Sequence, residues 1–329
     1  LTLFPYTPLF RSETGHLMGL NDYYSYEKTD AGAQTEAPAG CADMMDMNVG
    51  DHNAYSKMLY NWLRPKNGDK GLHLLNVDGS SNDFTITLNS FEDSGDAIVV
   101  RNTSKDPWNK SPYDEYLVLQ YSTPTGMNAS DSKGYGEWKT IQNSHGGTYE
   151  FPGLQVFHVD SRNGQQVGTY DTATKTITSS KWTYTDELRS TALYKEDGTF
   201  VGPSEALASN TKKSSSNGGS AYIVDGQLKT EAPYRELSAI LSSGVNGLTS
   251  TSFYNLFGTQ ANLFGTKDYA ASKSTTYGGD TYSNYKLRDF YANDLFFNDG
   301  SSFNWTFSVT AQTDSTCTLH FVNNEAIGK

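Results

Sequence analysis

Eight short segments after Pro65 restrict the fold most strongly, because each is rich in β-branched and aromatic residues and has apolar residues in alternation or in an unbroken run. Glycine, asparagine, aspartate and proline turns separate them, which is typical of strands rather than helices. Residues 67–329 are therefore predicted to form a β-rich region resembling an antiparallel sandwich. The segments are FTITLNSF (84–91), AIVVRN (97–102), EYLVLQYS (115–122), LQVFHVD (154–160), TKTITSSKWTY (174–184), AYIV (221–224), FNWTFSVTA (303–311) and TCTLHFV (316–322).

Two other segments have a helical pattern. In DHNAYSKMLYNWLRP (51–65) apolar residues recur every three or four positions, which predicts an amphipathic helix that Asp51 caps and Pro65 ends. YRELSAILSSGVNG (234–247) ends at a glycine and predicts a second, isolated helix. Helices that precede and interrupt a β-rich region place the chain in the α+β class.

Composition narrows the possible partners. The formal net charge is -12, so long-range attraction to nucleic acid or to an anionic membrane has the wrong sign. The sequence contains no uninterrupted apolar run of the roughly 18 residues that a membrane span requires. Cys41 and Cys317 are the only cysteines, which excludes a disulfide framework and predicts two buried thiols, with a single bridge between them as the alternative. The abundance of tyrosine, glycine and small polar residues is typical of extracellular β proteins.

The first residues, LTLFPYTPLFRS (1–12), lack the basic start, the long apolar stretch and the small-residue cleavage site of a signal peptide. They match the translation of a common sequencing adaptor except at Pro8. We interpret residues 1–12 as an adaptor-derived extension, with an ordinary apolar strand as the alternative. The natural pattern then begins at Glu13.

The stretch SETGHLMGLND carries most of the chemical information. In the helical motif H-E-x-x-H the two histidines lie four residues apart on one face and bind one metal ion, and the glutamate lies beside it. Here Ser12 stands at the first histidine position, while Glu13 matches the glutamate of the motif and His16 matches its second histidine. Gly19 permits a turn off the helix, and Asp22 can return as an oxygen ligand. The competing interpretation is a packed or capping histidine.

A second stretch, GCADMMDMNVGDHNAYSKMLYNWLRP (40–65), follows this one. Together they resemble the M6 family of secreted bacterial metalloproteases, the immune inhibitor A-like peptidases. In that family H-E-x-x-H-x-x-G-x-x-D precedes a loop of the type D-M-M-D-x-N-x-G-D-H-N-A-x-S-K. The resemblance continues through PYDEYLVLQYSTPTGMN (112–128) and GLQVFHVDSR (153–162). Ser12 departs from the family pattern.

The resemblance implies a secreted, extracellular zinc endopeptidase that acts on polypeptide substrates. It implies that residues 13–66 are the helical C-terminal part of a zincin catalytic domain, truncated within the motif, and that residues 67–329 follow as the β-rich region. Zn²⁺ would polarise the scissile carbonyl and acidify a water molecule. Because the extension ends in Ser12 where the family has the first histidine ligand, the chain as written is expected to bind zinc weakly and to lack activity.

The same resemblance assigns individual roles. Glu13 would be the general base and acid, and His16 and Asp22 would be zinc ligands. An apolar methionine turn beneath the metal would come from Met44, Met45 or Met47. Asp43 or Asp46 stays open as a replacement for Asp22, whereas Asp51 is interpreted as a helix cap.

A different class of function also fits the composition. Tyrosine and tryptophan are abundant enough to build stacking surfaces, so the alternative is a non-catalytic extracellular β-sandwich that serves as a binding or adhesion module, for example for glycans. A natural serine at position 12 would favour it. His158 and Asp160 lie two residues apart on a predicted strand and face the same way, but a strand histidine beside a carboxylate is more often structural. No zinc ligand is therefore expected beyond residue 70.

Overall fold

The fold is mixed α+β, and most of the regular structure is strand. The N-terminal residues 1–12, and with them Ser12, lie outside the described ranges, as do Gly19 and Met47. The computed structural model describes residues 13–18, 20, 22–24, 36–46, 50–63, 71–76, 82–101, 115–129, 151–161, 164–171, 173–174, 176–184, 222–224, 227–229, 236–241, 248–249, 263–273 and 304–323.

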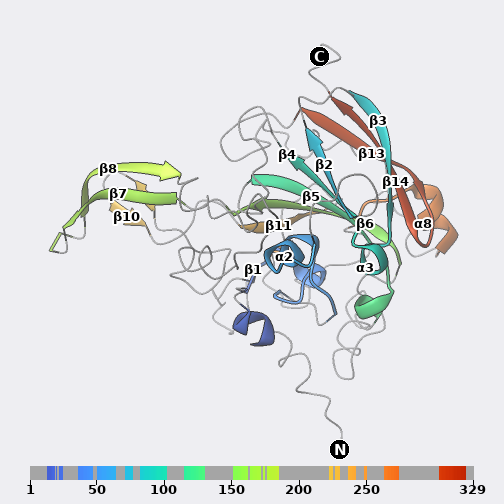
Figure 1. Cartoon of the computed structure of the whole chain (residues 1–329), viewed down its shortest axis with the longest axis horizontal. Coiled ribbons are helices and arrows are strands. Elements are labelled where there is room, and N and C mark those ends of the chain that lie inside the picture. The colour runs from blue at the N-terminus through green and yellow to red at the C-terminus, as the bar shows by residue number, and fades with distance from the viewer. Residues whose placement is uncertain are drawn as a thin grey trace, which may run out of the picture.

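A five-stranded sheet forms the centre of the molecule (Figure 1). Its strand order is β11-β6-β5-β4-β2, and all neighbours are antiparallel except β2 and β4, which are parallel. The strands are β2 (Leu72–Asn76), β4 (Ala97–Arg101), β5 (Glu115–Ser122), β6 (Gly153–Asp160) and β11 (Leu237–Ile240).

Both faces of this sheet are buried, because successive side chains of a strand point to opposite faces. In β4, Ala97 and Val99 face one core, while Ile98 and Val100 face the other. The first core is covered by α2 (Ala54–Leu59) and by the loops around it. A three-stranded antiparallel sheet covers the second core in the order β13-β14-β3, with β3 (Asp83–Asn89), β13 (Trp305–Gln312) and β14 (Thr316–Asn323). The architecture is a helical layer, a central sheet and an outer sheet.

Smaller elements complete the described structure. One further sheet has the strand order β7-β8-β10-β9, with β7 (Gly164–Asp171), β8 (Thr176–Tyr184), β9 (Tyr222–Val224) and β10 (Gln227–Lys229). The two-residue strands β1 (Glu36–Ala37) and β12 (Leu248–Thr249) pair with each other. The remaining helical elements are η1 (Gly40–Ala42), α3 (Phe91–Ser94), η2 (Gly126–Asn128) and α8 (Lys267–Lys273). No helix in the described ranges is long and apolar enough to cross a membrane.

The helix predicted over 234–247 is wrong where the structure describes it, because Leu237–Ile240 is the edge strand β11. Leu237 and Ala239 face the core beneath α2, whereas Ile240 faces the opposite core. This alternation extends over only four residues. Helix-favouring residues around it therefore dominated the sequence pattern, and pairing with β6 overrode their preference.

The helix predicted over 51–65 is shorter than its pattern, since α2 has six residues. Its N-cap is Asn53 rather than Asp51, because the Asn53 side chain accepts a hydrogen bond from the backbone N–H of Ser56 at 2.9 Å. Asp51 pairs instead with the Lys57 ammonium at 2.6 Å. The chain leaves the helix through Asn61, whose φ of 61° is left-handed.

Candidate metal site

His16 lies in a short helix of residues 13–17, and the chain then turns back so that Asp22 approaches it. The His16 Nδ1 atom lies 2.8 Å from the carbonyl oxygen of Leu20, and a carbonyl can only accept, so Nδ1 carries the proton. The other ring nitrogen, Nε2, is 3.1 Å from Oδ1 of Asp22, which is 3% exposed. A ring that also carries a proton on Nε2 donates it to this carboxylate, whereas a ring protonated on Nδ1 alone directs a lone pair at it. In the second case the two atoms are placed to share a cation.

Glu13 occupies the first position of the same helix and is exposed. Residues three apart share a helix face, so Glu13 lies on the face that carries His16. The structure thus brings His16 and Asp22 together and leaves Glu13 accessible to solvent beside them.

Met45 packs directly beneath this helix. It is fully buried, and a β-carbon on Gly15 would lie 2.5 Å from its Sδ atom. The Met45 carbonyl accepts a hydrogen bond from the Tyr23 N–H at 2.8 Å, which fastens the segment after Asp22 to the methionine loop. Met44 is also buried, and Met47 lies outside the described residues.

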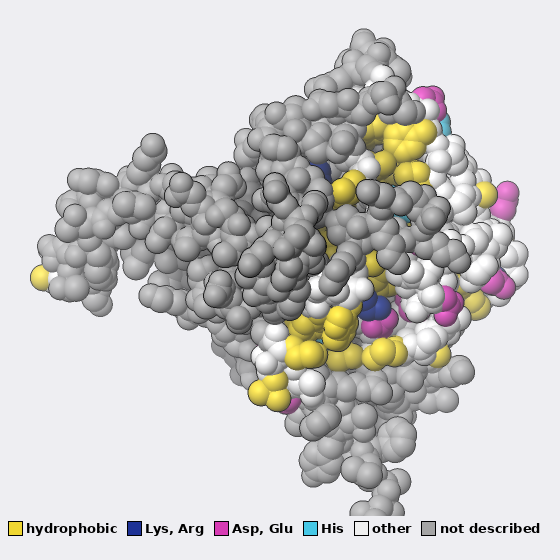
Figure 2. All heavy atoms as spheres, in the orientation of Figure 1, with side chains coloured by type: hydrophobic (Ala, Val, Ile, Leu, Met, Phe, Trp, Pro, Cys, Tyr) yellow, Lys and Arg dark blue, Asp and Glu magenta, His cyan; other side chains and the backbone are white. Residues whose placement is uncertain are grey.

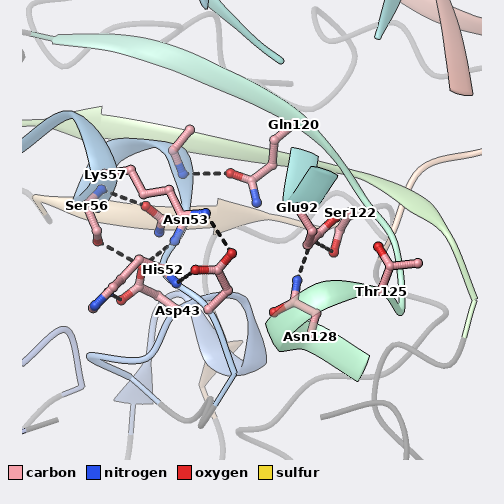
Figure 3. A network of polar contacts seen from close by, with 12 residues as sticks. Asp43, His52, Asn53, Ser56, Lys57, Glu92, Gln120, Ser122, Thr125 and Asn128 are labelled. Carbon is pink, nitrogen blue, oxygen red and sulfur yellow. Dashed lines mark hydrogen bonds and ion pairs between the residues drawn. The ribbon is translucent and has the colours of Figure 1, made fainter. Parts of the chain in front are cut away.

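Asp43 is the centre of a buried hydrogen-bond network (Figure 3). Its Oδ1 accepts from the Met45 N–H at 2.8 Å, and its Oδ2 accepts from the Asn53 N–H at 2.6 Å and the Ser56 hydroxyl at 2.8 Å. His52 Nδ1 lies 3.4 Å from Oδ1. Both oxygens are therefore committed to holding the loop against the start of α2. This arrangement does not favour Asp43 as a substitute metal ligand.

Asp46 has a different environment. Its Oδ2 accepts from the backbone N–H groups of Ala39 at 2.7 Å and Gly40 at 3.0 Å, while its buried Oδ1 has no hydrogen-bond partner among the described residues. Burial raises the pKa of the Asp46 carboxyl well above its usual value, and the carboxylates of Asp43 and Asp22 raise it further. Of the two alternatives to Asp22, Asp46 is the one with an uncommitted oxygen.

Tyr60 joins the end of α2 to the motif helix. Its hydroxyl donates to the carbonyl of Gly15 at 3.1 Å, and its ring packs against Trp62 with 4.5 Å between centroids. Burial raises the pKa of Tyr60, and the Asp43 carboxylate adds to the effect, so the hydroxyl remains a donor. The sequence pattern assigns this tyrosine no role and gives no signal for the hydrogen bond.

A second polar network, around Glu92, fixes α3 and η2 to the end of β5 (Figure 3). Its carboxylate accepts from the Ser122 hydroxyl, the Thr123 N–H and the Asn128 amide. Burial raises the pKa of Glu92. Because these donors already surround the carboxylate, the network is structural.

His158 also has a carboxylate partner, since its Nε2 lies 2.9 Å from Oε1 of Glu115 on the neighbouring strand, and both side chains are buried. Within the described ranges, no group of three histidine, cysteine, aspartate or glutamate side chains is placed to hold a metal ion. His16 and Asp22 thus offer two donors, and position 12, where a third is expected, falls outside those ranges.

No protein-family model matches the sequence, and neither a curated protein nor a solved structure shows significant similarity to it.

Proposed function

We propose that this chain is a zinc endopeptidase of the M6 type whose first ligand position is occupied by Ser12. The observation that carries the proposal is the pair formed by His16 Nε2 and Asp22 Oδ1, 3.1 Å apart. Two ligands of a tetrahedral zinc ion, with bonds of about 2.0–2.1 Å, lie about 3.3 Å from each other. The observed separation is therefore close to that of two ligands sharing one ion.

The hydrogen bond on the far side of the imidazole supports the same interpretation. Metal-binding histidines usually donate their other N–H to a carbonyl or carboxylate, which fixes both tautomer and ring orientation. His16 has this arrangement through the Leu20 carbonyl. The ring is thus oriented so that Nε2 faces Asp22.

The catalytic roles follow from these positions. Zn²⁺, when bound, supplies polarisation of the scissile carbonyl and an acidified water molecule. His16 and Asp22 would hold the ion, and Glu13 would accept a proton and return it to the leaving amine. Packing of Met45 against Gly15 holds the helix in position. The substrates are polypeptides, and the location is extracellular.

Serine at position 12 limits this activity. A neutral hydroxyl is a poor zinc ligand beside imidazole, and loss of a direct ligand costs more than the ~10- to 100-fold that follows changes in the surrounding shell. The chain as written is therefore expected to bind zinc weakly and to lack peptidase activity.

Calorimetric zinc titration tests the proposal. Ser12→His is expected to raise the zinc affinity by more than about 100-fold. Adding His16→Ala or Asp22→Ala to that variant abolishes the gain. The matched control is His320→Ala, since His320 forms an exposed pair with Asp83 at 2.7 Å, of similar chemistry but remote in sequence. Tight stoichiometric binding by the unaltered chain, or no gain from Ser12→His, contradicts the proposal and favours the binding-module alternative.

A further inference from the structure

The arm of the chain that carries His16 is held by α2 through one hydrogen bond. The Tyr60 hydroxyl, at the end of α2, donates to the Gly15 carbonyl at 3.1 Å, and the bond is buried. This carbonyl belongs to the peptide group immediately before His16. Because a peptide group is planar, fixing its oxygen restricts the backbone position of the histidine that follows.

The arm that carries Asp22 is held by α2 as well. The Tyr23 hydroxyl lies 2.8 Å from Oγ of Ser56. Ser56 itself donates to Oδ2 of Asp43 at 2.8 Å (Figure 3). A serine hydroxyl has a single hydrogen, so Tyr23 must be the donor to Ser56. The Tyr23 N–H also donates to the Met45 carbonyl, which fixes the peptide group immediately after Asp22.

Both contacts come from one face of α2. Ser56 and Tyr60 are four residues apart, and the Tyr60 N–H bonds to the Ser56 carbonyl at 3.2 Å as in a continuing helix. Their hydroxyl groups therefore reach the two arms from a common support. Hydrophobic side chains gather on the same side of the molecule as α2 in Figure 2, whereas the hydroxyl contacts themselves are buried. A lost donor is not replaced by water in such a place.

We propose that three residues of this contact, here called the hydroxyl clamp, position the side chains of the candidate metal site. They are Tyr23, Ser56 and Tyr60. The clamp fixes the peptide group before one member of the pair and the peptide group after the other, so it sets the 3.1 Å separation between His16 Nε2 and Asp22 Oδ1. The role of the clamp in metal binding rests on the proposed function, whereas its effect on the pair does not.

Nuclear magnetic resonance of the His16 ring tests the clamp in the chain as written. Asp22→Asn is expected to shift the ring resonances of His16, because it changes the group that faces Nε2. Tyr23→Phe and Tyr60→Phe are expected to shift them in the same direction, since each releases one arm of the chain while the ring still fills its space.

Tyr55→Phe is the matched control. The Tyr55 hydroxyl is also on α2 and buried, but it bonds to Glu236 on the central-sheet side and to neither arm. The control is expected to lower stability in urea without moving the His16 resonances. If the clamp variants likewise destabilise the protein and leave these resonances in place, the hydroxyl groups are only structural and the inference is overturned. Resonances that do not respond to Asp22→Asn overturn it too, because the pair is then not formed in solution.

Zinc titration of the Ser12→His protein gives a second measurement. Tyr23→Phe in that background is expected to lower the zinc affinity by about 10-fold or more, as changes in groups that orient metal ligands do, whereas Tyr55→Phe leaves it unchanged. Unchanged affinity in both variants overturns the role of the clamp in metal binding. If Ser12→His gains no zinc affinity, the proposed function fails, and the His16 resonances alone decide whether the clamp sets the pair.

Discussion

The Tyr60 hydroxyl donates to the main-chain carbonyl of Gly15 across 3.1 Å, and this bond links two segments 45 residues apart in the chain. It connects the end of α2 with the helix of the candidate metal site. Because the contact is buried, the carbonyl has no water to replace a lost donor.

Tyr60→Phe therefore destabilises the protein by about 1–2 kcal/mol, since the phenyl ring fills the same space and leaves the Gly15 carbonyl unsatisfied. Urea denaturation measures the change. Tyr269→Phe is the matched control, because the Tyr269 hydroxyl bonds to Asp314 on the surface, and its effect is expected to stay within about 0.5 kcal/mol. Equal effects of the two substitutions contradict the prediction.

The close approach of Gly15 to Met45 gives a second prediction. Gly15→Ala improves helix propensity by about 1 kcal/mol but places a methyl group 2.5 Å from the Met45 sulfur, and overpacking of this kind costs about 1–3 kcal/mol. In the background of Met45→Ala the clash disappears, so Gly15→Ala is stabilising there. A double-mutant cycle measures the coupling, and additivity of the two changes rules out the contact.

Asp43→Asn is expected to destabilise the protein strongly, although the two side chains have nearly the same size. In Asp43→Asn one oxygen becomes an N–H₂ group, which faces a backbone N–H or the Ser56 hydroxyl and cannot accept from it. Loss of a buried charged acceptor is expected to cost about 3 kcal/mol or more. Asp314→Asn removes a mostly exposed carboxylate from its pair with Lys273 and costs less than about 1 kcal/mol. Thermal unfolding of the two variants at one pH compares them, and similar melting temperatures refute the assignment.

Asp46→Asn, in contrast, is expected to stabilise the protein, by an amount that depends on pH. A carboxyl whose pKa is higher in the folded state binds its proton more tightly when folded, so stability falls as pH rises from the unfolded pKa, 3.8, through the raised folded value. Asp46→Asn has no charge to bury, and its amide oxygen still accepts from the Ala39 and Gly40 N–H groups. The free energy of unfolding of the variant, relative to the parent, therefore increases from pH 4 to pH 7. A difference that is constant or falls with pH contradicts this.

The strands of the two large sheets were predictable because they are half or fully buried and keep their period over five or more residues. EYLVLQYS coincides with β5, and TCTLHFV lies within β14. Strand β2 was not predicted although it pairs with β4, since its sequence LHLLN contains no β-branched residue. Edge strand β11 has an alternation of only four residues among helix-favouring neighbours, so its pattern predicted a helix instead.

The candidate site was predictable only in part. Motif spacing brought together His16 and Asp22, whose approach depends on a local turn. Asp43 and Asn53 accept hydrogen bonds from backbone N–H groups that the loop brings to them. A periodic sequence pattern does not predict such contacts. Asp51 precedes the apolar stripe, and its position therefore predicted the cap. The cap in the structure is Asn53, because its side chain reaches the N–H of Ser56.

The attachment of α2 to the central sheet has a consequence for the order of folding. The Ala54 N–H bonds to the Gln120 side chain on β5, 66 residues later, and the Tyr55 hydroxyl bonds to Glu236, 181 residues later. Closing loops of this length costs chain entropy before any contact is gained, so such contacts form slowly. The start of α2, and with it the loop that Asp43 holds, acquires its final shape after the sheet exists. During refolding, the part of the candidate site that Asp43 holds is therefore expected to be completed after the sheet, whereas the local turn that joins His16 and Asp22 needs no such loop closure.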